Sequence, residues 1–343
     1  METRKHVLGK EHLGSLVSMA SLASMYSSQG RLKGAEELEV RVMETMKRVL
    51  GEEHPNSLTT MSNLAWTYLA QGQWKEAEEL HVLVMETRKR VLGEEHPDSL
   101  ISMGNLASTY WNQGRWKEAE ELFVLVMETT KRVLGEEHPD TLTTMNNLAS
   151  TYGNQGRWKE AEGLEVLVMK TRKRVLGEEH PDTLTTMNNL ASTYNNQGRW
   201  KEAEELNVFV METKKWVLGE EHPGSLMSMD NLALMYRNQG RWEEAEELNV
   251  FVMETMKWVL GEGHPDLLIS MGNLAYMYRD QGRWKEAEEL QVQVMEMRKR
   301  VLGEEHPDSL TGMANLASTY RSQGLWKEAE DMDVLVMEST QQA

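Results

Sequence analysis

The sequence predicts an all-α protein, a right-handed α-solenoid of antiparallel helix hairpins, and three observations lead to this prediction. Eight histidines recur every 42 residues, from His12 to His306. All seven prolines directly follow a histidine of this series, from Pro55 to Pro307. A tyrosine recurs at the same step. Self-similarity at one fixed period is typical of repeat proteins, in which each unit is one supersecondary element that packs on its neighbours.

The period divides the chain into a short lead and eight units. Residues 1–12 are predicted to be the tail of a preceding second helix, and residues 13–343 to be the repeat array. The length alone would suggest about two domains, but one continuous array describes the pattern better. The predicted repeats are 13–54, 55–96, 97–138, 139–180, 181–222, 223–264, 265–306 and 307–343.

The first half of each unit has the pattern of an amphipathic helix. In the third unit, Leu100, Met103 and Leu106 recur at the spacing that places apolar side chains on one side of a helix. Pro97 suits the first helical position, and Gly114 suits the residue just past a helix end. We therefore expect a helix of roughly 16 residues, about 24 Å long.

The second half is predicted to be a longer helix of roughly 20 residues. In the third unit it runs from Trp116 to Leu134, and Gly135 closes it. Lys131 and Arg132 fall in its last turn, where the helix dipole favours cations. A lone hairpin cannot bury both apolar stripes, so stacked hairpins must cover them. We expect the recurring methionines and one series of tryptophans to be core residues: Trp74, Trp116, Trp158, Trp200, Trp242, Trp284 and Trp326.

These residues resemble the tetratricopeptide repeat. Leu106, Ala107 and Tyr110 match the first-helix core of that family, Ala119 matches its second-helix alanine, and Phe123 matches its aromatic position. A methionine replaces the family tryptophan, and the closing proline is absent. The 42-residue period resembles the kinesin-light-chain type and is most similar to the C-terminal arrays of fungal nucleotide-binding innate-immune-like receptors. The resemblance implies a tetratricopeptide superhelix that binds a protein or peptide in its concave groove.

Four first-helix positions vary widely between repeats and lie on one stripe. In the third unit they are Ile101, Gly104, Ser108 and Trp111. Their spacing of three, four and three residues places them about 100° round the helix from the apolar core. The candidate ligand-binding residues at these positions in other repeats are Trp66, Leu69, Asp230, Arg237, Tyr276, Arg279 and Arg321.

This variable stripe matches the positions that line the concave groove in tetratricopeptide arrays, so we expect it to contact a ligand. The alternative is that exposed positions drift freely. Drift would scatter variation over every polar face, yet exposed positions such as Lys117, Glu118, Glu120 and Glu121 barely change between repeats.

An unvarying asparagine runs beside the stripe, with Ser21 in its place in the first unit. One amide per repeat, with a donor and an acceptor, can hydrogen-bond the backbone of an extended peptide. The alternative is an asparagine that bonds the neighbouring hairpin. The series is Asn63, Asn105, Asn147, Asn189, Asn231, Asn273 and Asn315.

A second variable set lies on the second helix, at the Phe123 position and at Thr130 seven residues on. It is a candidate extension of the same surface, and its direction stays open. Trp216 and Trp258 stand where other units carry arginine, and we expect both aromatics to be exposed.

The sequence predicts no enzyme, no cofactor and no metal site. Zinc ligands must all lie about 2 Å from one ion, whereas repeat geometry separates the periodic histidines. We expect His96 to cap the first helix or pack in the turn, and Glu120 and Glu121 to lie on a solvated helix face. A net charge of −18 disfavours nucleic acid. The absence of cysteines and of long apolar runs favours a cytoplasmic protein that does not enter membranes.

The predicted function is therefore the binding of a protein or peptide ligand in the concave groove. Trp66, Leu69, Ile101, Trp111 and Phe123 would supply apolar anchors in the N-terminal half, and the arginines of the stripe would attract acidic residues in the C-terminal half. One alternative is a self-assembling scaffold or spacer that stacks end to end through uncapped hairpins. Others are a cargo or adaptor module of kinesin-light-chain type, or the sensor part of a larger receptor whose nucleotide-binding switch domain is not in this chain.

Overall fold

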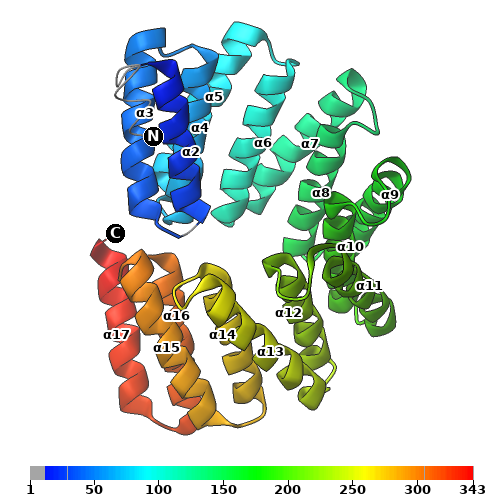
Figure 1. Cartoon of the computed structure of the whole chain (residues 1–343), viewed down its shortest axis with the longest axis vertical. Helices are drawn as coiled ribbons and strands as arrows, with labels where there is room; N and C mark the ends of the chain where they lie inside the picture. The colour runs from blue at the N-terminus through cyan, green and yellow to red at the C-terminus, as the bar shows by residue number, and fades with distance from the viewer. Residues whose placement is uncertain (1–11, 29, 305, 343) are drawn as a thin grey trace. The chain divides into compact units, whose positions relative to one another are not determined.

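The computed structural model describes residues 12–28, 30–304 and 306–342, and sixteen α-helices account for nearly all of this part of the chain. The expected all-α array of antiparallel hairpins is confirmed. The predicted second-helix tail at residues 1–12 lies, apart from His12, outside the described residues. The chain divides into two compact units, each made of several consecutive repeats (Figure 1). We call them unit 1 (Met1–Leu176) and unit 2 (Gly177–Ala343), and each is described by itself. From here on, "unit" means one of these two parts and "repeat" means one 42-residue segment.

Each unit consists of consecutive helix hairpins. Unit 1 contains α2 (Leu13–Ser28), α3 (Leu32–Leu50), α4 (Pro55–Ala70), α5 (Trp74–Leu92), α6 (Pro97–Asn112), α7 (Trp116–Val133), α8 (Pro139–Asn154) and α9 (Trp158–Leu176). Unit 2 contains α10 (Pro181–Asn196), α11 (Trp200–Leu218), α12 (Pro223–Asn238), α13 (Trp242–Leu260), α14 (Pro265–Asp280), α15 (Trp284–Leu302), α16 (Pro307–Gln323) and α17 (Trp326–Gln342).

The histidine–proline pairs start the first helices. The Nδ1 atom of His96 accepts a hydrogen bond from the amide N–H of Asp98 at 3.1 Å, and His54 caps α4 in the same way through Asn56. Proline at the next position loses nothing, because its missing N–H would have no partner in the first turn. The predicted histidine cap is therefore confirmed.

Glycines with positive φ end the helices. Gly114, in the turn inside a hairpin, has φ 74°, and Gly93, at the end of a second helix, has φ 95°. A side chain with a Cβ atom would be strained in this region of backbone space, which explains why glycine recurs at both turns.

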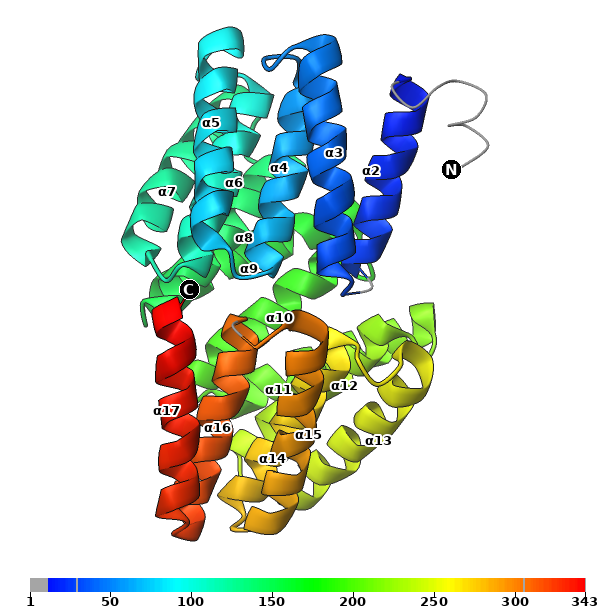
Figure 2. The same cartoon turned by 90° about the vertical axis from the view of Figure 1, so that its left-hand side faces the viewer.

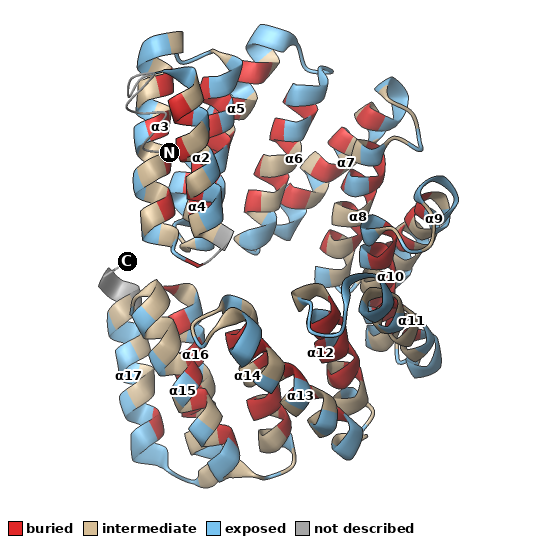
Figure 3. Ribbon diagram, viewed as in Figure 1, coloured by how far each residue is buried: buried red, intermediate tan, exposed pale blue. Residues whose placement is uncertain are grey.

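The core lies between helices, where buried residues gather on the faces that neighbouring helices turn to one another (Figure 3). Leu100 and Met103 of α6 form a buried cluster with Val126 of α7, and Met85 of the preceding hairpin packs against it. Burial of a side chain of this size stabilises by about 1.5–3 kcal/mol. The predicted packing role of the first-helix methionines is confirmed at Met103, which is 3% exposed.

Second helices also pack on the next first helix, which extends each hairpin into a stack within its unit. These contacts join α3 to α4, α5 to α6 and α7 to α8 in unit 1, and α11 to α12, α13 to α14 and α15 to α16 in unit 2. Figure 2 shows α14, α15, α16 and α17 side by side. Neighbouring first helices also touch, at α6 and α8 and at α12 and α14.

The prediction that the tryptophans opening the second helices are core residues is wrong for part of the series. Trp242 is half-buried and packs against the buried cluster of Ala245, Leu274 and Met277, but other members are exposed. Trp74, Trp116 and Trp200 are 40%, 39% and 41% exposed. Each occupies the first residue of its helix, directly after the hairpin turn. A Cβ atom at Gly153 would be 3.3 Å from the Trp158 ring, which shows how closely the ring approaches the turn.

Candidate functional site

The variable stripe of unit 1 is open to solvent. Trp66 on α4 is 40% exposed, and Ile101 and Trp111 on α6 are 45% and 36% exposed. A Cβ atom built on Gly104 would meet no other atom within 4 Å, so the surface beside it is also open. Ser108 is half-buried. The stripe therefore presents large apolar side chains beside small ones.

A buried histidine supports one of these apolar side chains. The rings of Trp66 and His81 meet edge to face, with their centroids 5.4 Å apart. His81 lies on α5, and its Nδ1 atom is 2.7 Å from the Oγ1 atom of Thr109 on α6. Burial lowers the pKa of His81 to about 4, so the imidazole is neutral near neutral pH. The sequence showed His81 only as an isolated residue, and nothing in it indicated this contact. Leu69, the other predicted residue of α4, is half-buried.

Two of the three predicted arginines in unit 2 share one carboxylate. Arg237 donates from Nε and Nη2 to Oδ2 of Asp280, at 2.9 and 2.7 Å. The Nε atom of Arg279 is 3.9 Å from Oδ1 of the same Asp280. The Tyr276 ring lies close to both, with its centroid 5.9 Å from the Cζ atom of Arg237 and 4.9 Å from that of Arg279. Two guanidinium groups and one carboxylate leave one net positive charge beside the ring.

Arg321 has a different partner. Its Nη1 atom donates to Oδ2 of Asp333 on α17, at 2.5 Å, within its own hairpin. The three arginines were predicted to act together on acidic residues, but only Arg237 and Arg279 share a partner among the described residues.

Asp230 lies inside the hairpin packing of unit 2. It is 8% exposed, and it accepts hydrogen bonds on α14 from the Nδ2 atom of Asn273 at 2.8 Å and from the Oγ atom of Ser270 at 3.2 Å. Burial raises the pKa of the Asp230 carboxyl, and the two hydrogen bonds oppose this rise. These contacts join α12 to α14. At Asn273 the asparagine series thus has its alternative role, a bond to the neighbouring hairpin.

The other asparagines of the series differ from Asn273. Asn63 and Asn231 are exposed, and the rest are half-buried. No hydrogen bond of their side-chain amides is found within the described part of the chain. These residues are Asn63, Asn105, Asn147, Asn189, Asn231 and Asn315.

The variable set on the second helix does not extend this surface, which corrects the candidate extension. Phe123 and Thr130 are each 2% exposed. The equivalents of Phe123 in six other repeats are all buried, namely Glu39, His81, Glu165, Asn207, Asn249 and Gln291. This position faces the next first helix, and in unit 2 the Nδ2 atom of Asn249 lies 4.0 Å from the Sδ atom of Met277, 28 residues on.

The second helices do carry two exposed aromatics. Trp216 is 84% exposed and Trp258 is 78% exposed, which confirms the prediction for both.

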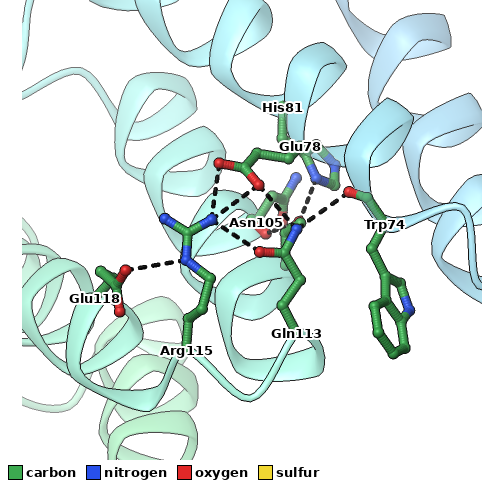
Figure 4. A network of polar contacts seen from close by, with 8 residues as sticks. Trp74, Glu78, His81, Asn105, Gln113, Arg115 and Glu118 are labelled. Atoms are coloured by element: carbon green, nitrogen blue, oxygen red, sulfur yellow. Dashed lines mark hydrogen bonds and ion pairs between the residues drawn. The ribbon is translucent and has the colours of Figure 1, made fainter.

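A polar network, not predicted from the sequence, joins the turn between α6 and α7 to the preceding hairpin (Figure 4). The Nε2 atom of Gln113 donates to Glu78 at 2.9 Å and to the backbone oxygen of Trp74 at 3.2 Å. Arg115 donates from Nη1 to Glu78 at 2.9 Å and from Nε to Glu118 at 3.0 Å. The guanidinium also lies 4.0 Å from the Tyr110 ring centroid, a cation–π contact.

This network recurs in other repeats and explains several constant positions. Arg157 binds Glu120 at 2.7 Å, and Arg241 binds Glu204 at 2.8 Å. Glu120 is therefore part of a contact between hairpins and not of a purely solvated helix face. Because Glu118 and Glu120 have a structural reason to stay constant, their constancy does not distinguish ligand binding from drift. The exposure of the stripe itself is the stronger observation.

Two further geometric tests concern the described residues. No group of three or more histidine, aspartate or glutamate side chains there is placed to hold a metal ion. No helix there has the length and apolar character that a bilayer crossing requires.

The chain belongs to the tetratricopeptide repeat family. One family model with the description "Tetratricopeptide repeat" matches residues 15–56, 57–98, 183–224, 225–266, 267–308 and 309–343, and a second with the same description matches residues 98–165. Members of this family commonly bind proteins or peptides in the concave groove and typically have no catalytic activity. None of the curated proteins compared with the chain matches it.

Solved structures give the same fold. The nearly identical TPR-like repeats of a Podospora anserina protein named for the kinesin light chains are 34% identical, with a TM-score of 0.51, over 60% of this chain and 98% of that one. The apo quorum sensor NprR of B. thuringiensis is 16% identical, with a TM-score of 0.61, over 99% of this chain and 90% of that one. Apo RapI is 12% identical, with a TM-score of 0.60, over 83% and 98%. At these identities, NprR and RapI bear on the fold alone.

Proposed function

We propose that this chain is a protein- or peptide-binding repeat domain whose ligands lie along the variable stripe of the first helices. The exposure of Trp66, Ile101 and Trp111 carries this proposal. The stripe of the same helices that contains Leu100 and Met103 is buried between hairpins, whereas these large apolar side chains remain uncovered. Exposed aromatic side chains are typical of the residues that dominate binding energy at protein interfaces.

The asparagine amides supply the second component of the proposed site. Six of them have no hydrogen-bond partner among the described residues, and each has both a donor and an acceptor. An extended peptide backbone presents N–H and C=O groups that such amides can bind without regard to sequence. The variable stripe would then select side chains, which is the division of roles seen in other modes of peptide recognition.

Unit 2 is proposed as a separate subsite with a preference for acidic residues. Arg237 and Arg279 compete for the single carboxylate of Asp280, and Arg279 is the more distant of the two. A ligand carboxylate would give Arg279 a partner of its own through a charge-assisted hydrogen bond. Tyr276 would supply apolar contact beside it.

Two biological settings fit this proposal, and both rest on the division of residues 13–343 into eight repeats. The similarity to the Podospora repeats favours a cargo or adaptor module of kinesin-light-chain type. The sequence resemblance to fungal receptor arrays favours the sensor part of a larger receptor.

Selection from a displayed library of random peptides tests the binding proposal, because it requires no identified ligand. The wild-type chain is expected to select apolar sequences through unit 1 and acidic sequences through unit 2. Trp111→Ala should lose the first group and Arg279→Glu the second. Lys117→Glu is a matched control, since it makes the same charge change as Arg279→Glu at an exposed position outside the stripe.

Identical peptides from all four proteins would contradict the proposal. If no peptide is selected and light scattering grows with protein concentration, the self-assembling scaffold becomes the better description.

A further inference from the structure

An arginine–glutamate ion pair connects successive loops in unit 1. The Nη2 atom of Arg90, in the last turn of α5, is 2.7 Å from Oε1 of Glu53 in the loop before α4. Arg132, at the end of α7, pairs with Glu95 at 2.8 Å in the same way. In each pair the glutamate precedes the arginine by 37 residues.

Two repeats of unit 2 replace the arginine of this pair by tryptophan. Trp258 occupies the arginine position, and Glu221 occupies the glutamate position 37 residues earlier. The same replacement occurs one repeat earlier, with Trp216 and Glu179. Glu221 has no ion pair among the described residues, while the Trp258 side chain is 78% exposed. Each replacement thus leaves a carboxylate without its arginine and an uncovered indole ring.

Trp258 and Glu221 border the same surface hollow. Its other lining residues include Leu218, His222 and Pro223 from the end of α11 and the start of α12. Because both residues line this space, a ligand group that enters it meets the two of them.

The nearby cations are already engaged. Lys257 pairs with Glu262 at 3.1 Å, and Lys215 pairs with Glu220. The Nδ1 atom of His222 accepts the amide N–H of Gly224 at 3.0 Å and caps α12. Glu221 is therefore the acidic group at this hollow whose charge remains uncompensated.

We propose that Trp258 and Glu221 form a binding site for an arginine side chain of a partner protein. The guanidinium would stack on the indole ring, because the ring face attracts cations. It would also donate two hydrogen bonds to the Glu221 carboxylate, a geometry that suits arginine. The ligand group thereby takes the place of the arginine that unit 1 carries within its own chain. A net charge of −18 would speed the approach of a basic segment. This site lies at the loop ends of the hairpins and does not depend on the ligand of the first-helix stripe.

The test uses a peptide of sequence Gly-Arg-Gly-Gly-Arg-Gly with blocked ends, and the same peptide with citrulline in place of arginine. Citrulline keeps the shape of arginine but is neutral. The readout is the indole N–H resonance that disappears from the NMR spectrum of Trp258→Phe. We expect this resonance to shift saturably with the arginine peptide and to stay in place with the citrulline peptide.

Three variants make the test specific. Glu221→Gln should lower the affinity about two- to fivefold, the range expected when an exposed ion pair is lost. Trp258→Arg restores the unit 1 pair and should abolish binding. Leu125→Arg adds the same charge in unit 1, at a side chain that is 47% exposed, and should leave the affinity unchanged.

The proposal is overturned if the citrulline peptide shifts the resonance equally. It is also overturned if Glu221→Gln and Trp258→Arg bind like the wild type, which would indicate general attraction to an acidic protein. A shift with protein concentration alone would show that a second copy of the chain covers this face, which contradicts a partner arginine.

Discussion

The two units share one hairpin framework but differ in how their variable positions are used. In unit 1 the stripe presents Trp66, Ile101 and Trp111 with large exposed surfaces. In unit 2 the corresponding helices carry Asp230 and Arg237, which pair with residues of α14. A variable position can therefore serve contacts within the chain as well as ligands. The candidate site therefore consists of those variable residues whose side chains have no strong partner within the chain.

The variable second-helix position of Phe123 and its equivalents also serves contacts within the chain, because it lies in the core. It holds an aromatic in α7 of unit 1, where Phe123 packs with Ala107, Ala119 and Leu148. In unit 2 it holds Asn249 against Met277. Asn207 likewise faces Met235 of the next hairpin, so this position makes contacts between neighbouring hairpins.

The largest effect is expected at the buried aromatic that distinguishes unit 1. Phe123→Ala should lower the free energy of unfolding by about 3–5 kcal/mol, because it removes a large side chain and leaves a cavity. Phe251→Ala in unit 2 is the matched control, since that ring is 39% exposed, and it should cost less than about 1 kcal/mol. Urea unfolding followed by circular dichroism measures both. Equal losses of unfolding free energy in the two variants would show that the deeper burial of Phe123 does not contribute to stability.

The next largest effect is a pH dependence that belongs to His81. Burial holds its pKa at about 4, below the value of 6.5 expected in the unfolded chain. The unfolded state therefore binds more protons between these values. Stability from the neutral imidazole is complete above pH 6.5 and is lost as pH falls toward 4, by up to about 3 kcal/mol.

His81→Gln places at this position the residue that unit 2 carries at Gln291, and it should remove this part of the pH dependence. Unfolding free energies of both proteins between pH 4 and 7.5 make the comparison. Parallel curves would mean that His81 has an ordinary pKa in the folded protein.

A smaller loss is expected from the polar network at the hairpin turns. Arg115→Leu introduces the residue that unit 2 has at Leu325, where the network lacks its arginine. The change removes two partly exposed ion pairs and one cation–π contact, so it should cost about 1–2 kcal/mol. Thermal unfolding would detect this, with Lys117→Ala as a nearby exposed control. If Arg115→Leu and Lys117→Ala unfold at the same temperature, the network does not contribute to stability.

The smallest stability change accompanies the substitution that converts a unit 1 loop into a unit 2 loop. Arg132→Trp breaks an exposed ion pair with Glu95 and should cost at most about 1 kcal/mol. The variant should instead gain affinity for the arginine peptide, because it pairs an indole with an uncompensated carboxylate. NMR titration with the same peptide checks this gain, and its absence would show that unit 2 contributes more than these two residues.

Sequence reasoning was sufficient for the framework because its signals are periodic. The His–Pro pair and the two glycines of each repeat have fixed backbone roles, so they predicted where helices such as α6 begin and end. The same reasoning failed at Trp116, because a helical apolar spacing does not show that the first residue of a helix lies at the hairpin turn. It also left the direction of Phe123 open, since the orientation of a second helix depends on the neighbouring hairpin.

The candidate site was predictable only in part for a similar reason. Exposure of Trp66 and Trp111 followed from helical geometry within one repeat. The partners of Arg237 and Asp230 lie 43 and 40 to 43 residues away, on another hairpin. Contacts at that distance in sequence depend on how hairpins stack, and a single repeat does not contain this information.

The most direct test of the proposed function is a calorimetric titration with two library-selected peptides, one apolar and one acidic. Each peptide is titrated into four proteins. These are the wild type, Trp111→Ala, Arg279→Glu and the control Lys117→Glu. We predict that an apolar peptide loses at least tenfold in affinity with Trp111→Ala, and an acidic peptide with Arg279→Glu, because each variant removes a central contact. The control should bind both peptides like the wild type. Unchanged affinities in both stripe variants would contradict ligand binding by the first-helix stripe.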